Sequence, residues 1–167
     1  MIYIVMGVSG CGKSTFGQLL AERLGCPFYD GDDFHPAANV SKMTQGQPLN
    51  DADREPWLRK LSAAMIDWNK QGNAVLACSA LKKYYREVLL KSNIPTVFIY
   101  LRLEQNTLEE RLRKREGHFF NPSLLGSQFE TLEEPEDAIT LEAGKLSPDA
   151  LLAQLLRQPH FKSLNIG

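Results

Sequence analysis

The stretch that decides the fold is GVSGCGKS at residues 7–14, which follows the apolar run IYIVM at residues 2–6. It matches the pattern G-x-x-x-x-G-K-[ST], in which a glycine-rich loop joins a strand to a helix. The glycines let successive backbone N–H groups point at one anion, and the helix N-terminus adds a partial positive charge. The stretch therefore predicts a phosphate-binding loop between a first strand and a first helix.

The loop also predicts how a nucleotide would be held. Lys13 is expected to reach the terminal phosphates of ATP, which makes it a candidate catalytic residue, and Ser14 offers a hydroxyl ligand to Mg²⁺. Cys11 has two interpretations, an activated thiol at a helix N-terminus or a tolerated small residue. The expected nucleotide-binding residues are Gly7, Val8, Ser9, Gly10, Cys11, Gly12, Lys13, Ser14, Thr15 and, from a later helix, Arg111.

Apolar runs rich in β-formers recur along the whole chain and alternate with helical patterns. This alternation is typical of βαβ units. The runs are nearly continuous in apolar residues, as expected where helices cover both faces of a parallel sheet. The sequence therefore predicts an α/β fold in a single domain, residues 1–167, with strands at residues 2–6, 27–29, 74–78, 96–101 and 139–141.

Helix signals lie between these runs. Asn50 is a predicted N-cap and Gly72 follows the end of its helix, while Ser147 is a predicted cap before Pro148. A possible capping box joins Thr107 to Glu110. The predicted helices cover residues 16–24, 57–68, 82–91, 107–115 and 147–157.

Composition excludes several classes of protein. The 167 residues carry a net charge of −1, without the basic excess that nucleic-acid binders usually have. The three cysteines show no CxxC spacing, which argues against a disulfide framework or a zinc site and favours a reducing, cytoplasmic location. The N-terminal run is too short for a membrane anchor and lacks the basic start of a signal peptide, so no membrane association is expected.

Other features separate the classes of nucleotide-binding protein. The sequence has no N-K-x-D tetrapeptide, and Ser79 follows the third apolar run where a motor ATPase would carry an aspartate. Both features argue against a GTPase or motor. Asp32, which follows the second run, is then the carboxylate best placed to act beside the metal.

On two predicted helices, pairing of opposite charges four residues apart leaves two cations each without a partner. Arg111 and Arg115 share one helix face, and Lys82 and Arg86 share another. Each pair has two interpretations, a solvated face or a contact with an anionic ligand at the carboxyl ends of the strands. Arg115 also begins a stretch without helical period, and residues 115–123 are predicted to form a lid.

The segment DGDDFHPAANVSKM, residues 30–43, concentrates polar side chains behind the second predicted strand. Asp30 and Asp33 are assigned to the turn itself. The remaining groups suit a small acceptor with many hydroxyls and one carboxylate. From this segment and the next helix start, the candidate substrate-binding residues are Asp32, His35, Asn39, Lys42, Asp51 and Arg54.

The chain resembles the gluconate kinase family, small P-loop kinases that use ATP to phosphorylate D-gluconate on its 6-hydroxyl. The resemblance rests on ordered blocks: MGVSGCGKST, DGDDFHPAANVSKMTQGQPLNDADREPWL, CSALKKYYRE, FIYL, KREGHFF and QFETLEEP. It implies a three-layer P-loop kinase fold with a five-stranded parallel sheet in the order 2-3-1-4-5, a substrate-binding helical region near residues 34–72, a lid and a homodimer. It also implies that the sugar-acid site includes Asp32, His35, Lys42, Arg54, Lys82, Arg86 and His118, and that Arg111 and Arg115 flank the nucleotide. Ser79 is a further candidate substrate-binding residue.

The expected reaction is direct in-line transfer. Lys13 and Arg115 would offset charge on the moving phosphoryl group, while Asp32 would orient the acceptor hydroxyl and accept its proton or act through positioning alone. Two alternatives remain open from the sequence. One is a kinase of the same fold for another acceptor, such as shikimate or adenylylsulfate, and the other is an adaptor that binds ATP without transferring phosphate.

Overall fold

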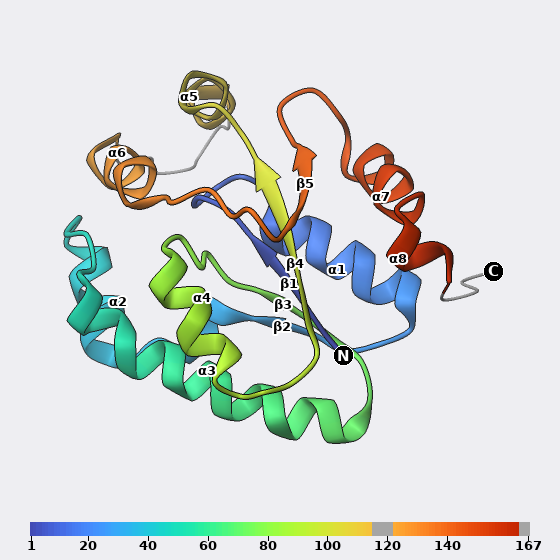
Figure 1. The fold of residues 1–167 in the computed structure, drawn as a ribbon. Coiled ribbons are helices and arrows are strands. Elements are labelled where there is room, and N and C mark those ends of the chain that lie inside the picture. Colours follow the sequence, from blue (N-terminus) through green and yellow to red (C-terminus); the bar gives the residue numbers. More distant parts are fainter. Residues whose placement is uncertain (115–121, 164–167) are drawn as a thin grey trace.

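The structure, a computed structural model, describes residues 1–114 and 122–163. Its centre is a sheet of five parallel strands in the order β2-β3-β1-β4-β5 (Figure 1). The predicted α/β fold and strand order are therefore confirmed, with ends that differ by one residue at most. The strands are β1 Ile2–Met6, β2 Phe28–Asp30, β3 Ala74–Ala77, β4 Thr96–Arg102 and β5 Ile139–Glu142.

Helices lie on both faces of the sheet, which explains the apolar strand sequences. Helices α3 and α4 pack on one face with α2 nearby, while α1, α7 and α8 lie on the other (Figure 1). Helices α5 and α6 lie beyond the carboxyl ends of the strands. The helices are α1 Lys13–Leu24, α2 Ala37–Thr44, α3 Asp51–Gln71, α4 Lys83–Leu90, α5 Gln105–Lys114, α6 Pro122–Thr131, α7 Pro148–Leu156 and α8 Pro159–Lys162, with a 3₁₀ helix η1 at Gly31–Phe34.

Local signals fix several helix ends. The side chain of Asn50 accepts a hydrogen bond from the backbone N–H of Asp53, whose carboxylate accepts in return from the N–H of Asn50. Ser147 caps α7 in the predicted way. The capping box at Thr107 was wrong, because α5 begins at Gln105 and Thr107 lies inside its first turn. Helix α6 was not among the predicted helices.

The core lies on both sides of β1. All five residues of β1 and all four residues of β3 are buried. Trp57 of α3 and Tyr85 of α4 are among the largest fully buried side chains, so α3 and α4 are fastened to the sheet by bulky aromatic groups. The same two residues reach the candidate site described below.

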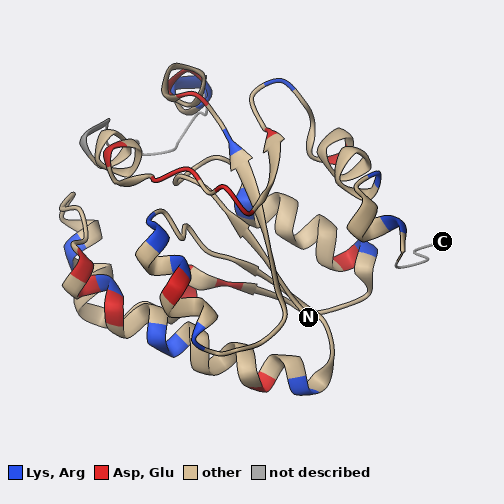
Figure 2. Cartoon of the chain, in the orientation of Figure 1, with Lys and Arg blue, Asp and Glu red and all other residues tan. Residues whose placement is uncertain are grey.

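Charges are mixed over the molecule. Acidic and basic side chains alternate along α3, and an acidic segment joins α6 to β5 (Figure 2). Among the described residues, no helix is both long enough and apolar enough to cross a membrane.

Candidate active site

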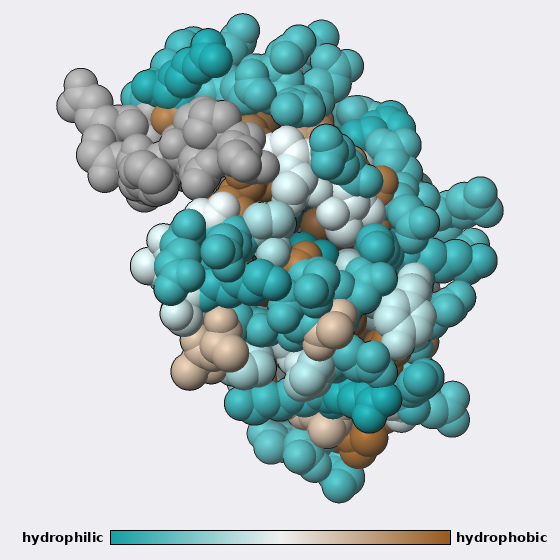
Figure 3. Space-filling model, turned by 90° about the vertical axis from the view of Figure 1, so that its left-hand side faces the viewer, coloured by the Kyte–Doolittle hydropathy of each residue, from teal (hydrophilic) through white to brown (hydrophobic). Residues whose placement is uncertain are grey.

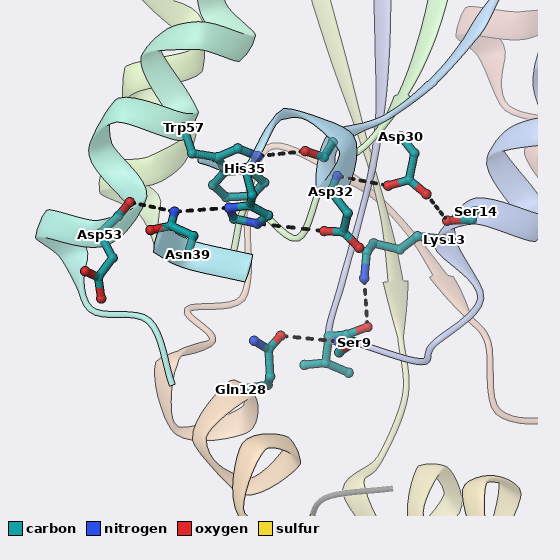
Figure 4. A network of polar contacts seen from close by, with 12 residues as sticks. Ser9, Lys13, Ser14, Asp30, Asp32, His35, Asn39, Asp53, Trp57 and Gln128 are labelled. Atoms are coloured by element: carbon teal, nitrogen blue, oxygen red, sulfur yellow. Dashed lines mark hydrogen bonds and ion pairs between the residues drawn. The ribbon is translucent and has the colours of Figure 1, made fainter. Parts of the chain in front are cut away.

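The phosphate-binding loop runs from the end of β1 to the start of α1, as predicted. Gly12 precedes the helix with φ 100°, a left-handed conformation that favours glycine. The ammonium of Lys13 donates to the carbonyl oxygen of Val8 at 3.0 Å, so it lies over its own loop. The hydroxyl of Ser14 donates to Asp30 Oδ2 at 2.8 Å (Figure 4). The loop therefore offers an amide cradle, an ammonium and a hydroxyl–carboxylate pair at one place.

Asp30 has two contacts, of which only one was expected. Its Oδ1 accepts a hydrogen bond from the backbone N–H of Asp32 at 3.0 Å, which confirms the turn role. Its Oδ2 accepts a hydrogen bond from the hydroxyl of Ser14, which links the end of β2 to the start of α1. The turn interpretation missed this second contact because Ser14 lies 16 residues away in the chain.

A cavity of about 680 Å³ joins the loop to the polar segment behind β2. Apolar side chains of α2, α5 and α6 form part of its wall, and Figure 3 shows apolar atoms near the centre of an otherwise mainly hydrophilic face. Lys13 and Asp32 both line this cavity, so the two halves of the predicted site face each other. Of the predicted residues, those in its wall are Ser9, Gly10, Lys13, Asp32, His35, Arg54 and Ser79.

Asp32 is the only one of the three aspartates of residues 30–33 that lines the cavity. Its side chain is 85% exposed when the cavity is counted as solvent. Loss of solvent in the cleft raises its pKa first, the negative charge of Asp30 raises it further, and the ammonium of Lys13 opposes both. The carboxylate therefore holds a proton more readily than an ordinary aspartate does, as a proton acceptor requires.

His35 lies beside Asp32 and is held on three sides. Its ring stacks on Trp57 with 4.1 Å between centroids and 16° between planes. Its Nδ1 lies 3.2 Å from the amide nitrogen of Asn39, and its Nε2 lies 3.9 Å from Asp32 Oδ1 (Figure 4). Burial and the charge of Arg54 lower the pKa of His35 to about 4, so the imidazole is neutral at physiological pH.

Gly31 brings the turn that carries Asp32 against β3. A Cβ at this position would lie 2.7 Å from the carbonyl oxygen of Ala77, and the Gly31 oxygen accepts a hydrogen bond from Trp57 Nε1 at 2.7 Å. We expect Gly31→Ala to lower the free energy of unfolding by about 1–3 kcal/mol, measured by urea denaturation, because the turn and β3 would have to move apart. The matched control is Gly126→Ala, where a helical Cβ would meet nothing within 4 Å. Equal stability of the two variants would contradict this close approach.

A second group of polar residues lies at the N-terminus of α3. Arg54 donates to the hydroxyl of Tyr85 at 2.8 Å, and this hydroxyl donates to Asp51 at 2.5 Å. Lys82 also donates to Asp51, at 2.9 Å. Hydrogen bonds from Tyr85 and then Lys82 lower the pKa of Asp51. Asp51 and Lys82 line an adjoining depression of about 540 Å³, and Arg54 lines both spaces.

Three predicted substrate residues have other partners. The guanidinium of Arg86, which is 8% exposed, donates to the carbonyl oxygens of Ala80, Leu81 and Glu133. Arg86 thus ties two backbone segments together, and it lines neither of the two cavities. Asn39 and Lys42 are both directed at Asp53, through its carbonyl oxygen at 2.9 Å and its carboxylate at 2.6 Å.

Two further predictions concern the nucleotide side. Arg111 donates to the carbonyl oxygens of Ala143 and Gly144 at 2.7 and 3.1 Å, which fastens α5 to the loop after β5. Burial raises the pKa of Cys11, which favours the interpretation of this residue as a tolerated small side chain. Arg115 and His118, together with most of the predicted lid at residues 115–123, lie outside the described residues.

Gln128 of α6 belongs to the site but was not predicted. Its Oε1 accepts a hydrogen bond from the backbone N–H of Ser9 at 3.3 Å, and its side chain lines the main cavity (Figure 4). Leu124 and Leu125 of the same helix also line this space. Gln128 is the first residue of QFETLEEP, a block that supports the family resemblance but was not assigned a role in the site.

Comparisons with known proteins show which family has this sequence and this fold. The family model described as shikimate kinase matches residues 9–144. A gluconokinase from Gluconobacter oxydans is 47% identical over 96% of this chain and 90% of its own, and the thermoresistant gluconokinase of Escherichia coli is 47% identical over 80% and 77%. The crystal structure of a gluconokinase from Sinorhizobium meliloti superposes with a TM-score of 0.80 at 39% identity, covering 96% of both chains. The chain thus belongs to the gluconokinases, within the shikimate kinase family of P-loop kinases.

Proposed function

We propose that this protein is a gluconokinase that transfers the terminal phosphoryl group of ATP to the 6-hydroxyl of D-gluconate. The observation that carries the proposal is the shared cavity, in whose wall the phosphate loop with Lys13 meets Asp32. The gluconokinases at 47% identity favour this acceptor over others of the same fold. A donor phosphate and an acceptor hydroxyl could therefore meet between two groups suited to phosphoryl transfer.

Each residue would have a distinct task in this reaction. Lys13 would offset charge on the phosphoryl group as it moves, with Arg115 as its proposed partner. Asp32 would orient the acceptor hydroxyl and take its proton. Arg54 and Lys82 would meet the substrate carboxylate, because Arg54 lines both spaces and Lys82 lines the adjoining one.

Magnesium would be held by Ser14 and Asp30. Both offer hard oxygen ligands, and they already lie 2.8 Å apart at the helix start where the phosphates would bind. Within the described ranges, no group of three or more His, Cys, Asp or Glu side chains could hold a metal ion. This suits Mg²⁺, which usually takes one or two protein ligands and completes its shell with phosphates and water. When bound, the ion would neutralise charge between the last two phosphates.

The test is ADP release measured with a coupled assay across aldonic acids and shikimate, with and without Mg²⁺. We expect turnover with D-gluconate and ATP that is lost when Mg²⁺ is removed. Turnover with shikimate alone would favour another acceptor class. ATP binding in calorimetry without turnover on any acceptor would instead support a nucleotide-binding adaptor.

Three features of the chain as a whole remain proposals. We propose that residues 1–167 act as one domain, that residues 34–72 supply the acceptor site, and that residues 115–123 close over it. We also propose a homodimer in the cytoplasm, for which the sequence resemblance and the cysteine pattern are the support. Sedimentation at two protein concentrations would test the dimer.

A further inference from the structure

Asn39 joins two elements of the acceptor site and is only 4% exposed. It lies in the first turn of α2, and its amide nitrogen contacts both Asp53 of α3 and His35 at the end of η1 (Figure 4). The contact with Asp53 is to a main-chain carbonyl oxygen, at 2.9 Å. A carbonyl oxygen can only accept, so the group that faces it must be the NH₂ of the amide.

This assignment decides the state of the histidine. The NH₂ group has two hydrogens, of which one points at Asp53 and the other at His35 Nδ1, 3.2 Å away. Nδ1 must then present its lone pair. A neutral imidazole carries one hydrogen, so that hydrogen lies on Nε2, the nitrogen on the side of Asp32.

We propose that Asn39 is a positioning residue that holds His35 in the Nε2–H tautomer, so that His35 offers the acceptor sugar a hydrogen-bond donor next to the Asp32 carboxylate. The proposal rests on the proposed function for the identity of the sugar. A hydroxyl group both donates and accepts, so Asp32 can take its hydrogen bond while His35 donates to it or to its neighbour.

The groups around His35 support the neutral form. Arg54 faces it from α3 and disfavours a second proton, as does burial against the stacked ring of Trp57. Asp32 on η1 is the charge that would favour protonation, but its Oδ1 is 3.9 Å away and Lys13 from α1 acts on the same carboxylate. Asn39 itself leaves no room for a hydrogen on Nδ1. His35 therefore cannot compete with Asp32 for the proton of the substrate.

A direct test reads the tautomer by long-range ¹H–¹⁵N correlation on protein labelled at its histidines. The chain has three, and the spectrum of His35→Gln identifies the signal of His35 by its loss. We expect a protonated Nε2 and an unprotonated Nδ1 throughout pH 6–8. A hydrogen on Nδ1, or a charged ring in this range, would overturn the proposal whether or not the protein phosphorylates gluconate.

The variant Asn39→Asp tests the consequence for activity. A carboxylate at this position would accept a hydrogen bond from Nδ1–H. In the neutral ring, Nε2 would then carry no hydrogen and could not donate into the cavity. The negative charge would also raise the pKa of His35. His35 would then have an Nε2–H donor only when its ring is charged. We expect kcat/KM for gluconate to fall as pH rises through that new pKa, to about a tenth of the wild-type value at pH 8, the loss of one hydrogen bond.

The matched control is Asn73→Asp, which adds the same charge next to the amino end of β3, whereas the cavity lies at the carboxyl ends of the strands. Its pH profile and its KM for ATP should equal those of the wild type. A loss in Asn39→Asp that is the same at every pH would show a merely structural role and overturn the proposal. If Asn39→Asp does not fold, the tautomer measurement on the wild-type protein decides alone.

Discussion

Replacement of Lys13 by alanine is expected to lower kcat by about 10²–10³-fold, the usual effect of removing one preorganised group that stabilises transition-state charge. Lys13 suits this task because its stem begins at the first residue of α1 and its ammonium lies over the loop, 3.0 Å from the Val8 oxygen. No other lysine among the described residues lines the main cavity. The measurement is steady-state ADP release with saturating ATP and gluconate.

Two observations accompany this prediction. The control Lys70→Ala removes a lysine whose side chain is 72% exposed and forms an ion pair with Asp67 on the same helix, so its kcat should match the wild type. The Lys13 ammonium also lowers the pKa of Asp32, so its removal should shift the acidic limb of kcat/KM to higher pH. A Lys13→Ala enzyme with more than a tenth of wild-type kcat would contradict the assigned role.

The second large effect is expected for Asp32→Asn, which keeps the shape of the side chain but cannot accept a proton. We expect kcat to fall by about 100-fold or more, the usual contribution of a general base. The wild-type enzyme should lose activity as pH falls through the Asp32 pKa, which lies above the ordinary aspartate value of 3.8. The asparagine variant should lack this acidic limb.

Asp67→Asn is the matched control, because its carboxylate is 73% exposed on α3, away from the cavity lining, and forms an ion pair with Lys70. A loss of less than tenfold in Asp32→Asn would argue against proton transfer and leave Asp32 as a positioning group. That outcome is chemically reasonable for a loose transition state, in which the base acts late. The pH profile separates the two roles, since positioning alone needs no ionised carboxylate.

Much of the fold was predictable because its signals are local. The phosphate loop, the continuous apolar strands and the caps at Asn50 and Ser147 each lie within a few residues. Helix α6 was missed for the same reason, because its sequence PSLLGSQFET contains a glycine and two serines and no regular apolar stripe. Leu125 of this helix is buried in the core, a tertiary contact that no local pattern records.

The candidate site was predictable only in part. Lys82 was taken to lack a partner because only neighbours on its own helix were considered, whereas Asp51 lies 31 residues away. The partners of Arg86 were not predicted because they are backbone carbonyls, which every residue possesses and which no sequence pattern marks. Residue types indicated the chemistry of the site, but tertiary contacts decided which side chains reach it.

The strand order has a consequence for the newly made chain. The phosphate loop follows β1 and Asp32 follows β2, yet β3 lies between these two strands in the sheet. Residues 1–50 therefore contain both chemical partners without the scaffold that aligns them, and a ribosome must add β3, Ala74–Ala77, before alignment can begin. Nascent chains shorter than this are expected to have no phosphotransfer activity, so the first turnover cannot precede the translation of β3.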